Sequence, residues 1–510
     1  MTPLETSLLE SVRAWKAFRL LVVGDFMLDQ ALSGDAERLS PDAPVPVLAV
    51  RNSSATTDTP GGAGNVAVFA AALGGVVHCV GVVGNDAEGG LLSAALSRSG
   101  CGTRGLVVDS ARPTTTKRSL IGRAQHRHPQ KMFRIDVESR EPLSAEIQSR
   151  LFAAIDEHLG ACDVVCLEDY RKGVCSPELC RRLIDRCRER NIPVLVDPAP
   201  IDDYGCYRGA TVITPNRSEA ERATGHSIDA SHAVEGSRVM AARLLNELEL
   251  EAVVITLDKD GALLQTKDSI AEHLPTVARQ VYDVTGAGDM VLAVLAGAVA
   301  NGMPWTEGVT LANIAAGLEV EVFGVRAISL AEIQAQLLTI AHVSAGKLRS
   351  RADLLIELAA HRAAGRTIVM TNGCFDIFHM GHAASLREAK GLGDILVVGV
   401  NCDEQVRASK GADRPVNTQS DRAELLGELS SVDYVIIFNE PTAEELVRAI
   451  RPEVYVKGGD YVGKEVTESA VVKTYGGKTV FVGVRQGLST SALVSRVRER
   501  FVAGGNSFPP

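Results

Sequence analysis

Short runs of valine, isoleucine and leucine recur along the first 260 residues, and longer amphipathic stretches separate them. The runs read RLLVVGD, VVHCVGVVG, DVVCLED, PVLVDP, ATVITPN and AVVITLD. Residues 176–191 and 231–249 lie between such runs and have helical periodicity. Nearly continuous apolar strands that alternate with helices are typical of a parallel sheet covered on both faces. We therefore predict a doubly wound α/β domain over residues 1–330.

This alternation pauses over residues 331–362, which are Ala-rich, charged and without a β run, and which we predict to form a helical connector. It then resumes with TIVMTNG, DILVVGVN, DYVIIF, EVYVKGGD and KTVFVGV. A second, smaller, mostly parallel doubly wound domain is predicted over residues 363–500, followed by a tail at 501–510. No internal repeat relates the two halves, so the chain reads as a fusion of two different α/β units.

Composition agrees with a soluble protein of several domains. A length of 510 residues exceeds what one hydrophobic core supports, and the 45% apolar content is ordinary. A net charge of −10 without a long basic run argues against nucleic acid as a partner. The mixed, charged start and the shortness of the apolar run at 291–300 predict neither a secretory signal nor a membrane span. The ten cysteines contain no C-x-x-C pair, so we expect reduced, buried thiols in a cytoplasmic protein.

The segment DVTGAGD at 283–289 precedes an apolar stretch that predicts a buried helix. Gly286 and Gly288 let successive backbone N–H groups point to one spot at the helix N-terminus, which favours an anion. Asp289 stands at the same place and could accept a proton from an attacking hydroxyl during phosphoryl transfer. A glycine turn with a capping aspartate is the alternative reading of this segment alone.

Three further motifs are expected at the carboxyl ends of strands, where ligands gather in doubly wound sheets. TPNRSE carries Asn216 and Glu219, which could organise magnesium and its waters. GGAGNVA at 61–67 opens a helix and presents Asn65, and GDFMLD at 24–29 supplies Asp25 and Asp29.

Together, GDFMLD, GGAGN, TPN-x-x-E and DVTGAGD resemble the motifs of the ribokinase-like sugar kinases over about residues 15 to 330. The resemblance implies that Asp289 is the catalytic base. In LEDYRKG, Arg171 occupies a position where the family has a small residue. The remaining implied roles are an anion hole of Gly286, Ala287 and Gly288, a magnesium–phosphate network of Asn216 and Glu219 with Glu219 acting through water, and substrate contacts from Asp25, Asp29, Gly62, Asn65, Asp169 and Lys172.

The second half contains TNGCFDIFHMGH at 371–382, in which two histidines stand three residues apart. Side chains at this spacing share a helix face, so His379 and His382 can both reach an α-phosphate at the helix start. Asn372 and Gly373 belong to the strand-to-helix turn below the phosphates. A zinc site or two surface histidines are the alternatives, but a zincin needs H-E-x-x-H.

HMGH resembles the H-x-G-H motif of nucleotidyltransferases, and later segments extend the likeness. Lone lysines are usually solvated, so these assignments depend on the resemblance. It implies that a late Ser/Thr turn meets the nucleotide phosphates and that basic residues face phosphate-rich substrates. The residues concerned are Lys410, Arg414, Lys457, Asp460, Ser489, Thr490 and Ser491.

The two halves together resemble the family of bifunctional heptose 7-phosphate kinases and heptose 1-phosphate adenylyltransferases of ADP-heptose biosynthesis, as in ERLSPDAPVPVLAV, FRIDVE and SKGADRPVN. The family implies ATP as substrate of both halves, Mg²⁺, a separate phosphatase acting between the two steps, and a homodimer. Three alternatives stay open. The sugar phosphate could be a related one, the kinase-like half could only bind a sugar, or the second half could transfer a cytidylyl group.

Overall fold

The computed structural model describes residues 3–50, 56–123, 129–227, 233–276, 285–321, 324–342, 346–461, 463–464 and 466–483. The chain divides into two compact units. The kinase-like unit comprises residues 10–333, and the transferase-like unit comprises residues 334–510 together with residues 1–9.

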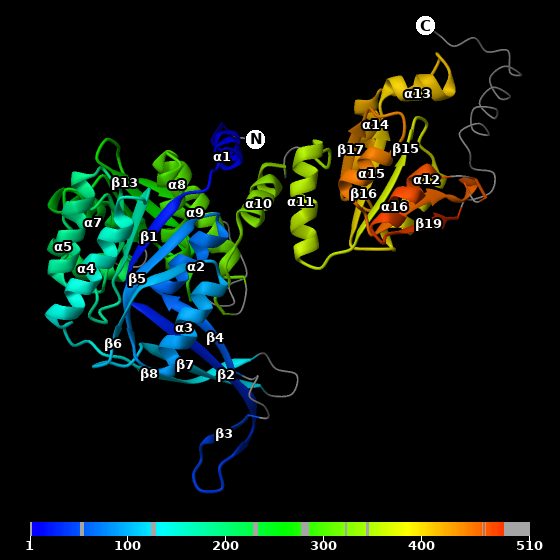
Figure 1. Ribbon diagram of the computed structural model, residues 1–510. Helices are drawn as coiled ribbons and strands as arrows, with labels where there is room; N and C mark the ends of the chain where they lie inside the picture. Colours follow the sequence, from blue (N-terminus) through cyan, green and yellow to red (C-terminus); the bar gives the residue numbers. More distant parts are fainter. Residues whose placement is uncertain are drawn as a thin grey trace, which may run out of the picture. The chain divides into compact units, whose positions relative to one another are not determined.

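A nine-stranded sheet forms the centre of the kinase-like unit (Figure 1). The six strands predicted from the apolar runs are confirmed, and all six are consecutive and parallel within it. The spatial order is β14 (Glu272–Leu274), β13 (Ala262–Thr266), β12 (Ala252–Thr256), β11 (Val212–Ile213), β10 (Val194–Asp197), β9 (Val164–Glu168), β1 (Arg19–Gly24), β5 (Val76–Gly84) and β6 (Gly102–Asp109).

Helices cover both faces of this sheet, as the doubly wound prediction requires (Figure 1). One face packs against α4 (Ala145–Leu159), α5 (Pro177–Glu189) and α7 (Ala233–Glu247), whose leucines, isoleucines and cysteines join alternate strand residues in one core. The other face packs against α8 (Ala287–Ala300) and α2 (Ala63–Ala72). The predicted buried helix is confirmed, because every α8 residue from Asp289 to Ala298 is buried. The unit also contains α3 (Ala87–Arg98), α6 (Arg217–Thr224), α9 (Trp305–Glu319), η2 (Gly205–Tyr207) and η4 (Asp258–Asp260).

A second sheet in this unit was not predicted. Its path is β3 (Pro46–Ala49), β2 (Phe26–Leu39), β7 (Thr116–Arg123) and β8 (Gln130–Val137), and β4 (Thr56–Gly62) also pairs with β2. These strands have no continuous apolar run, because much of this small sheet faces solvent. Seven of the eight β8 residues are exposed, for example.

The transferase-like unit has a five-stranded parallel sheet, and all five predicted strands are confirmed. Its order is β17 (Tyr434–Phe438), β16 (Ile395–Asn401), β15 (Ile368–Gly373), β18 (Val454–Gly458) and β19 (Lys478–Val482). Helices α15 (Glu444–Ile450) and α16 (Thr467–Thr474) pack on one face, and α12 (Met380–Lys390) and α14 (Gln419–Gly427) pack on the other. Helix α13 (Asp403–Lys410) and η5 (Gly459–Tyr461) also belong to this unit.

The predicted connector contains two helices, α10 (Leu330–His342) and α11 (Arg351–Ala363). Leu354 and Leu358 of α11 are fully buried in the core of the transferase-like unit. Leu348 also forms an isolated parallel bridge to Val435. Helix α11, predicted as part of the connector, therefore packs within the core of the transferase-like unit.

Two bulk predictions can be compared with the fold. All ten cysteines are free thiols, and seven of them are buried. Within the described residues, which also include α1 (Pro3–Arg13), no helix is long and apolar enough to cross a membrane.

Candidate active sites

The proposed base of the kinase-like unit lies at the start of α8. Gly286 is the N-cap of this helix with φ 98°, a conformation that L side chains rarely adopt. Ala287 and Gly288 form the first turn, so backbone N–H groups at this end are not used by the helix itself. Asp289 follows and is 4% exposed. The first residues of DVTGAGD, 283 and 284, lie outside the described residues.

Two side chains hold the Asp289 carboxylate. Asn65 Nδ2 donates to Oδ2 at 2.7 Å, and the Tyr170 hydroxyl donates to Oδ1 at 2.8 Å. Burial raises the pKa of Asp289 to about 6, while these two hydrogen bonds oppose the shift. A carboxylate with such a pKa is ionised at neutral pH yet is a stronger base than an exposed aspartate. Asn65 was predicted from the sequence. Tyr170 was missed, although it lies within the LEDYRKG motif that supplied Asp169 and Lys172.

Asp25 organises the loop that carries Tyr170. Its carboxylate accepts backbone N–H bonds from Tyr170 (2.9 Å), Lys172 (2.9 Å) and Val174 (3.2 Å). Asp169 also acts within this segment, accepting from the Tyr207 hydroxyl at 2.6 Å and from the Arg171 N–H at 2.8 Å. In the structure these two predicted substrate ligands thus shape the loop.

Lys172 forms an ion pair with Glu138, so its ammonium is engaged by the protein. Asp29 differs, since its Oδ1 is buried without a hydrogen-bond partner among the described residues. The charges of Lys117, Arg134 and Lys131 act on this carboxylate and lower its pKa, while burial, the larger effect, raises it. These three cations were not predicted from the sequence, because β7 and β8 were missed.

Asn216 and Glu219 form a reciprocal capping box at the start of α6. Asn216 Oδ1 accepts from the Glu219 N–H at 3.0 Å, and Glu219 Oε2 accepts from the Asn216 N–H at 2.9 Å. The N-x-x-E spacing therefore has a structural use that the sequence reading did not consider. Any role in a magnesium network is additional to it.

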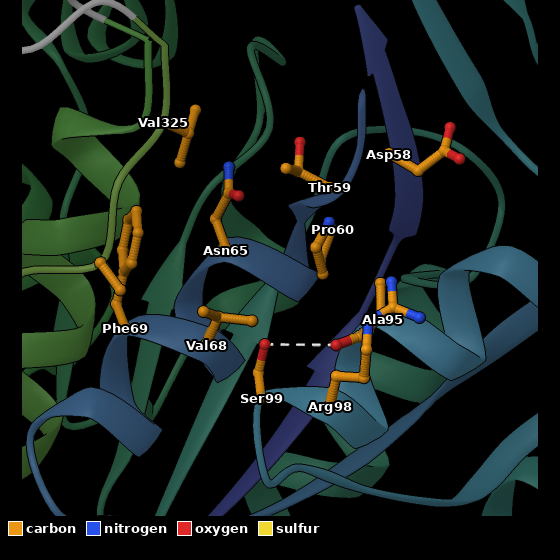
Figure 2. A pocket seen from close by; sticks show the side chains of 11 residues that line it. Asp58, Thr59, Pro60, Asn65, Val68, Phe69, Ala95, Arg98, Ser99 and Val325 are labelled. Atoms are coloured by element: carbon orange, nitrogen blue, oxygen red, sulfur yellow. Dashed lines mark hydrogen bonds between the residues drawn. The ribbon is translucent and has the colours of Figure 1, made fainter. Parts of the chain in front are cut away.

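A cavity of about 230 Å³ is lined in part by α2 and α3 of the kinase-like unit (Figure 2). Asn65 borders it and is the one predicted site residue that does so. Figure 2 shows the Asn65 side chain projecting from α2 toward the segment that carries Val325. Asn65 thus connects the buried carboxylate with an accessible space. Gly62 ends β4 and caps α2 immediately before it.

In the transferase-like unit, the two predicted histidines meet at the start of α12. His379 is the N-cap, and its Nδ1 accepts from the Gly381 N–H (3.1 Å) and the His382 N–H (3.3 Å). The rings of His379 and His382 stack with centroids 3.8 Å apart. His379 therefore precedes the helix instead of sharing a helix face with His382, but the two rings do come together. Because Nδ1 accepts, Nε2 carries the proton of the neutral ring and can donate.

Burial lowers the pKa of His382 to about 4, with smaller contributions from the His379 ring and the charge of Lys410. Burial also lowers the pKa of His379. Both imidazoles are thus neutral at neutral pH. Phe375 and Phe378 flank the His382 ring at centroid distances of 5.4 and 5.5 Å and contribute to that burial.

Asn372 and Lys457 also meet. Lys457 Nζ donates to Asn372 Oδ1 at 2.8 Å, and the Tyr455 hydroxyl donates to the same oxygen at 2.5 Å. Lys457 is buried and pairs with Glu468 at 3.3 Å. Gly373 is the last residue of β15, in register with Val400.

Arg414 pairs with Asp376, whose carboxylate also accepts from the Val416 N–H at 2.7 Å. Arg422 was not predicted, although it is 1% exposed and bonded to Asp403 at 2.7 Å. Its guanidinium also donates to the carbonyl oxygen of Cys374, and this bond holds the loop that precedes the H-x-G-H turn. The side chain of Asp460 and the predicted turn Ser489, Thr490 and Ser491 lie outside the described residues.

Two family models match the chain, the pfkB family carbohydrate kinases over residues 18–332 and the cytidylyltransferase-like proteins over residues 370–501. Proteins named Bifunctional protein HldE align with nearly the whole chain. The one from Trichlorobacter lovleyi is 41% identical over 95% of this chain and 96% of its own length. The one from Wolinella succinogenes is 42% identical, covering 94% and 98%.

The chain belongs to the HldE family. Membership in the HldE family confirms the resemblance drawn from the motifs and the order of the two halves. The protein is a bifunctional transferase, with a carbohydrate kinase half and a nucleotidyltransferase half.

Solved structures confirm the fold of the kinase half of this HldE family member. Phosphofructokinase-2 from Escherichia coli, in complex with substrates and products, aligns with a TM-score of 0.52 and 17% identity. The alignment covers 64% of this chain and 99% of that one. At this identity the likeness concerns the fold alone.

Proposed function

We propose that the protein carries out two steps of ADP-heptose formation. The kinase-like unit moves the γ-phosphate of ATP to the anomeric hydroxyl of heptose 7-phosphate. The transferase-like unit joins the adenylyl group of ATP to heptose 1-phosphate and releases pyrophosphate. One observation carries this proposal: a chain of the HldE family contains both sites. A carboxylate held by two hydrogen bonds lies at the start of α8, and two stacked imidazoles lie at the start of α12.

In the kinase step, Asp289 accepts the proton of the anomeric hydroxyl as its oxygen attacks the γ-phosphorus. The bond between that phosphorus and the bridging oxygen breaks, and ADP leaves. Asn65 and Tyr170 orient the carboxylate. The backbone N–H groups of Gly286, Ala287 and Gly288 donate to the oxygens of the transferred phosphoryl group and so stabilise its negative charge. The three cations around Asp29 suit a sugar that already carries a phosphate.

Magnesium fits the donors of this unit. Burial, and after it the charges of Glu219 and Asp289, raise the pKa of Asp197 well above its usual value, so these carboxylates lie near one another. Oxygen ligands of this kind suit Mg²⁺, which would offset charge on the ATP phosphates when bound. Glu219 keeps its capping bond to Asn216 in this arrangement and would act through water.

In the adenylyl step, an oxygen of the anomeric phosphate attacks the α-phosphorus of ATP, and the bond to the β-phosphate oxygen breaks. His379 and His382 donate to oxygens of the α-phosphate as neutral imidazoles. Lys410, Arg414 and Lys457 are the cations proposed to meet the phosphates of the two substrates. Asp460 and the turn at Ser489, Thr490 and Ser491 complete the proposed nucleotide site by family resemblance.

Neither unit has a proposed hydrolytic group, so a separate phosphatase removes the 7-phosphate between the two steps. The test is to incubate the full chain with ATP, Mg²⁺ and heptose 7-phosphate, and to add a phosphatase to a second tube. A bisphosphate in the first tube and ADP-heptose in the second are expected. No turnover in either tube would reject the proposal.

Two refinements are tested with the same assay. Substituting CTP for ATP separates adenylyl from cytidylyl transfer, and a panel of sugar 7-phosphates separates heptose from its relatives. Product formation from CTP but not ATP in the second step would favour the cytidylyl alternative. Absence of bisphosphate with normal ADP-heptose formation from supplied heptose 1-phosphate would favour a kinase-like half that only binds.

The exposed apolar side chains of the small sheet support a homodimer. Leu39, Phe133, Ile135 and Val137 are 42–67% exposed on β2 and β8. Light scattering of the purified chain should give twice the monomer mass. The ten free thiols support a reducing, cytoplasmic location.

A further inference from the structure

Three cysteine side chains meet beside the loop that carries Tyr170. Cys175 follows this loop, Cys180 lies near the start of α5, and Cys206 belongs to η2, which packs against α5. Hydrogen bonds join the Cys180 thiol to the thiols of Cys175 and Cys206. Cys180 is 0% exposed, whereas the other two are half-buried. This group of three, the thiol cluster, therefore has a buried centre and an edge that solvent can reach.

A carboxylate faces the same point. An oxygen of Asp169 and the sulfur atoms of Cys175 and Cys180 all lie within 4.8 Å of one another. Asp169 is held in place, because the Tyr207 hydroxyl donates to its Oδ2 at 2.6 Å and the Arg171 N–H donates to its Oδ1 at 2.8 Å. Each carboxylate oxygen has two lone pairs, so both can still accept a further partner.

The start of α5 fixes the two closest sulfur atoms. Ser176 caps this helix directly after Cys175, and its hydroxyl accepts from the Leu179 N–H at 3.2 Å. The Cys180 N–H donates to the Ser176 carbonyl oxygen at 2.9 Å in the first turn. The backbone thus holds Cys175 and Cys180 together before any ligand binds.

The charge of Asp169 acts on all three thiols. The Cys180 thiol lowers the pKa of Cys175, but burial and the Asp169 charge oppose this effect and raise the pKa overall. The contact with Cys175, together with burial and the Asp169 charge, raises the pKa of Cys180. Thiols of this kind contain little thiolate, so they form disulfides slowly. The same negative charge attracts a cation, which displaces thiol protons when it binds.

We propose that the thiol cluster and Asp169 bind Zn²⁺. Thiolate sulfur and carboxylate oxygen are both zinc ligands, and three sulfur atoms with one oxygen match the four-coordinate geometry of structural zinc sites. Cys206 contacts Cys180 on the outer side of the cluster and would supply the fourth donor. The ion would join the two ends of the Tyr170 loop, which begins at Asp169 and ends at Cys175, and would stabilise that loop. The site does not depend on the proposed sugar or on either transfer reaction.

The test uses full-length protein that is freed of metal with a chelator and kept reduced with a phosphine, with no nucleotide or sugar present. CdCl₂ is titrated as a probe while the ultraviolet charge-transfer band of cadmium thiolates is recorded. ZnCl₂ is then added as a competitor, and thermal melting is followed in parallel. Wild type should bind Cd²⁺ in equimolar amount, lose the band when Zn²⁺ displaces it, and melt at a higher temperature with either ion.

Alanine variants of the cluster locate the ion. Cys175→Ala and Cys180→Ala should each weaken Cd²⁺ binding by about tenfold or more, since even residues that only support metal ligands contribute this much. Cys206→Ala should have a smaller effect, because this thiol lies at the edge of the cluster. Asp169→Asn keeps an oxygen that can accept from Tyr207 but removes the charge, and it should weaken Zn²⁺ binding.

Cys187→Ala is the matched control. Cys187 is also a thiol of α5 with 0% exposure, and it packs in the hydrophobic core of the kinase-like unit. Without metal, Cys187→Ala and Cys180→Ala should both melt below wild type, since each removes a buried sulfur atom. With metal, only Cys187→Ala should show the wild-type band and the wild-type rise in melting temperature.

The proposal is overturned if wild type gives no charge-transfer band. It is also overturned if Cys175→Ala or Cys180→Ala binds Cd²⁺ like wild type, because the ion would then lie on other thiols of the chain. Thiols that serve only as packed side chains would give no band and the same melting temperature with and without metal. Since no sugar is used, failure of the proposed kinase reaction would leave this result unaffected.

Discussion

The proposed reactive groups of the kinase-like unit are carboxylates, whereas those proposed for the transferase-like unit are imidazoles. Burial is the largest influence on the pKa in both places. It raises the pKa of Asp289 to about 6 and lowers that of His382 to about 4. In each case the low-dielectric surroundings favour the neutral form of the side chain.

The same physical effect therefore suits two different tasks. A raised pKa makes a carboxylate a better proton acceptor, which an attacking hydroxyl requires. A lowered pKa keeps an imidazole uncharged at neutral pH, so that it donates a hydrogen bond without adding a full charge. An attacking phosphate is already ionised and needs no base, which agrees with the absence of a described carboxylate partner on the His379–His382 pair.

The largest expected effect comes from removing the carboxylate of the proposed base, Asp289. Asp289→Asn keeps the size of the side chain but cannot accept the proton of the hydroxyl, so we expect kinase turnover to fall by about 10² to 10⁴. ADP-heptose formation from supplied heptose 1-phosphate should stay at the wild-type rate. Coupled assays of ADP and pyrophosphate release measure the two activities separately. Equal kinase activity in variant and wild type would exclude Asp289 as the base.

His382→Ala provides the reciprocal test. Loss of one donor to the α-phosphate should lower adenylyl transfer by about 10² to 10³, a magnitude typical of a single oxyanion donor. Kinase activity should be unchanged. If both activities fell together, the substitution would have acted through folding, which melting curves would reveal.

The two activities should also respond differently to pH. Kinase turnover should fall about tenfold per unit below pH 6, because protonated Asp289 cannot accept a proton. Adenylyl transfer should be insensitive to His382 until the pH approaches 4, since only there does this ring become charged. Rates measured across this range for both reactions check the difference.

Tyr170→Phe tests whether the acidic limb of the kinase pH profile comes from Asp289 or from ionisation of the sugar phosphate. The Tyr170 hydroxyl bonds to the Asp289 carboxylate and lowers its pKa. Its removal should move the acidic limb of the kinase profile to higher pH, whereas a limb due to substrate would not move. The adenylyl profile of this variant should match that of wild type.

The role of Asn216 and Glu219 can be divided between structure and chemistry. Asn216→Ala removes the cap of α6 and should lower the free energy of unfolding by about 1 kcal/mol, measured by urea denaturation. Glu219→Gln keeps an oxygen for the capping box but removes the charge. It should unfold like wild type, and a drop in its kinase activity would indicate the water-mediated magnesium role.

The smallest expected effect concerns Arg171, which has φ 56°. Arg171→Gly should raise the free energy of unfolding by up to about 1 kcal/mol, because glycine adopts this conformation without a steric penalty but loses more chain entropy. Arg171→Ala keeps the steric penalty and serves as control. A stabilisation by alanine equal to that by glycine would contradict backbone strain at this position.

The parallel strands could be predicted because each is buried on both faces and so reads as an apolar run. The small sheet could not, since strands such as β8 are exposed and show no such run. Because this sheet was not predicted, the charges that act on Asp29 were not predicted either. They are those of Lys117, Lys131 and Arg134.

For the site, sequence motifs identified Asp289 and Asn65 separately, 224 positions apart, and the fold brought them into contact. The bond from Tyr170 depends on the loop that Asp25 holds through three backbone N–H groups, which no local pattern encodes. Likewise, the N-x-x-E spacing suggested a metal network, although a capping box accounts for the same two residues.

Strand pairing also limits how this protein can change in length. Gly24, Glu168 and Asp197 are neighbours across three parallel strands. Side chains alternate between the faces of a sheet at each residue. An insertion or deletion of one residue within Val164–Glu168 would therefore turn Glu168 to the opposite face and leave Asp197 without its neighbour. Length variation in related chains should accordingly fall in the loops that flank β9, not inside the strand.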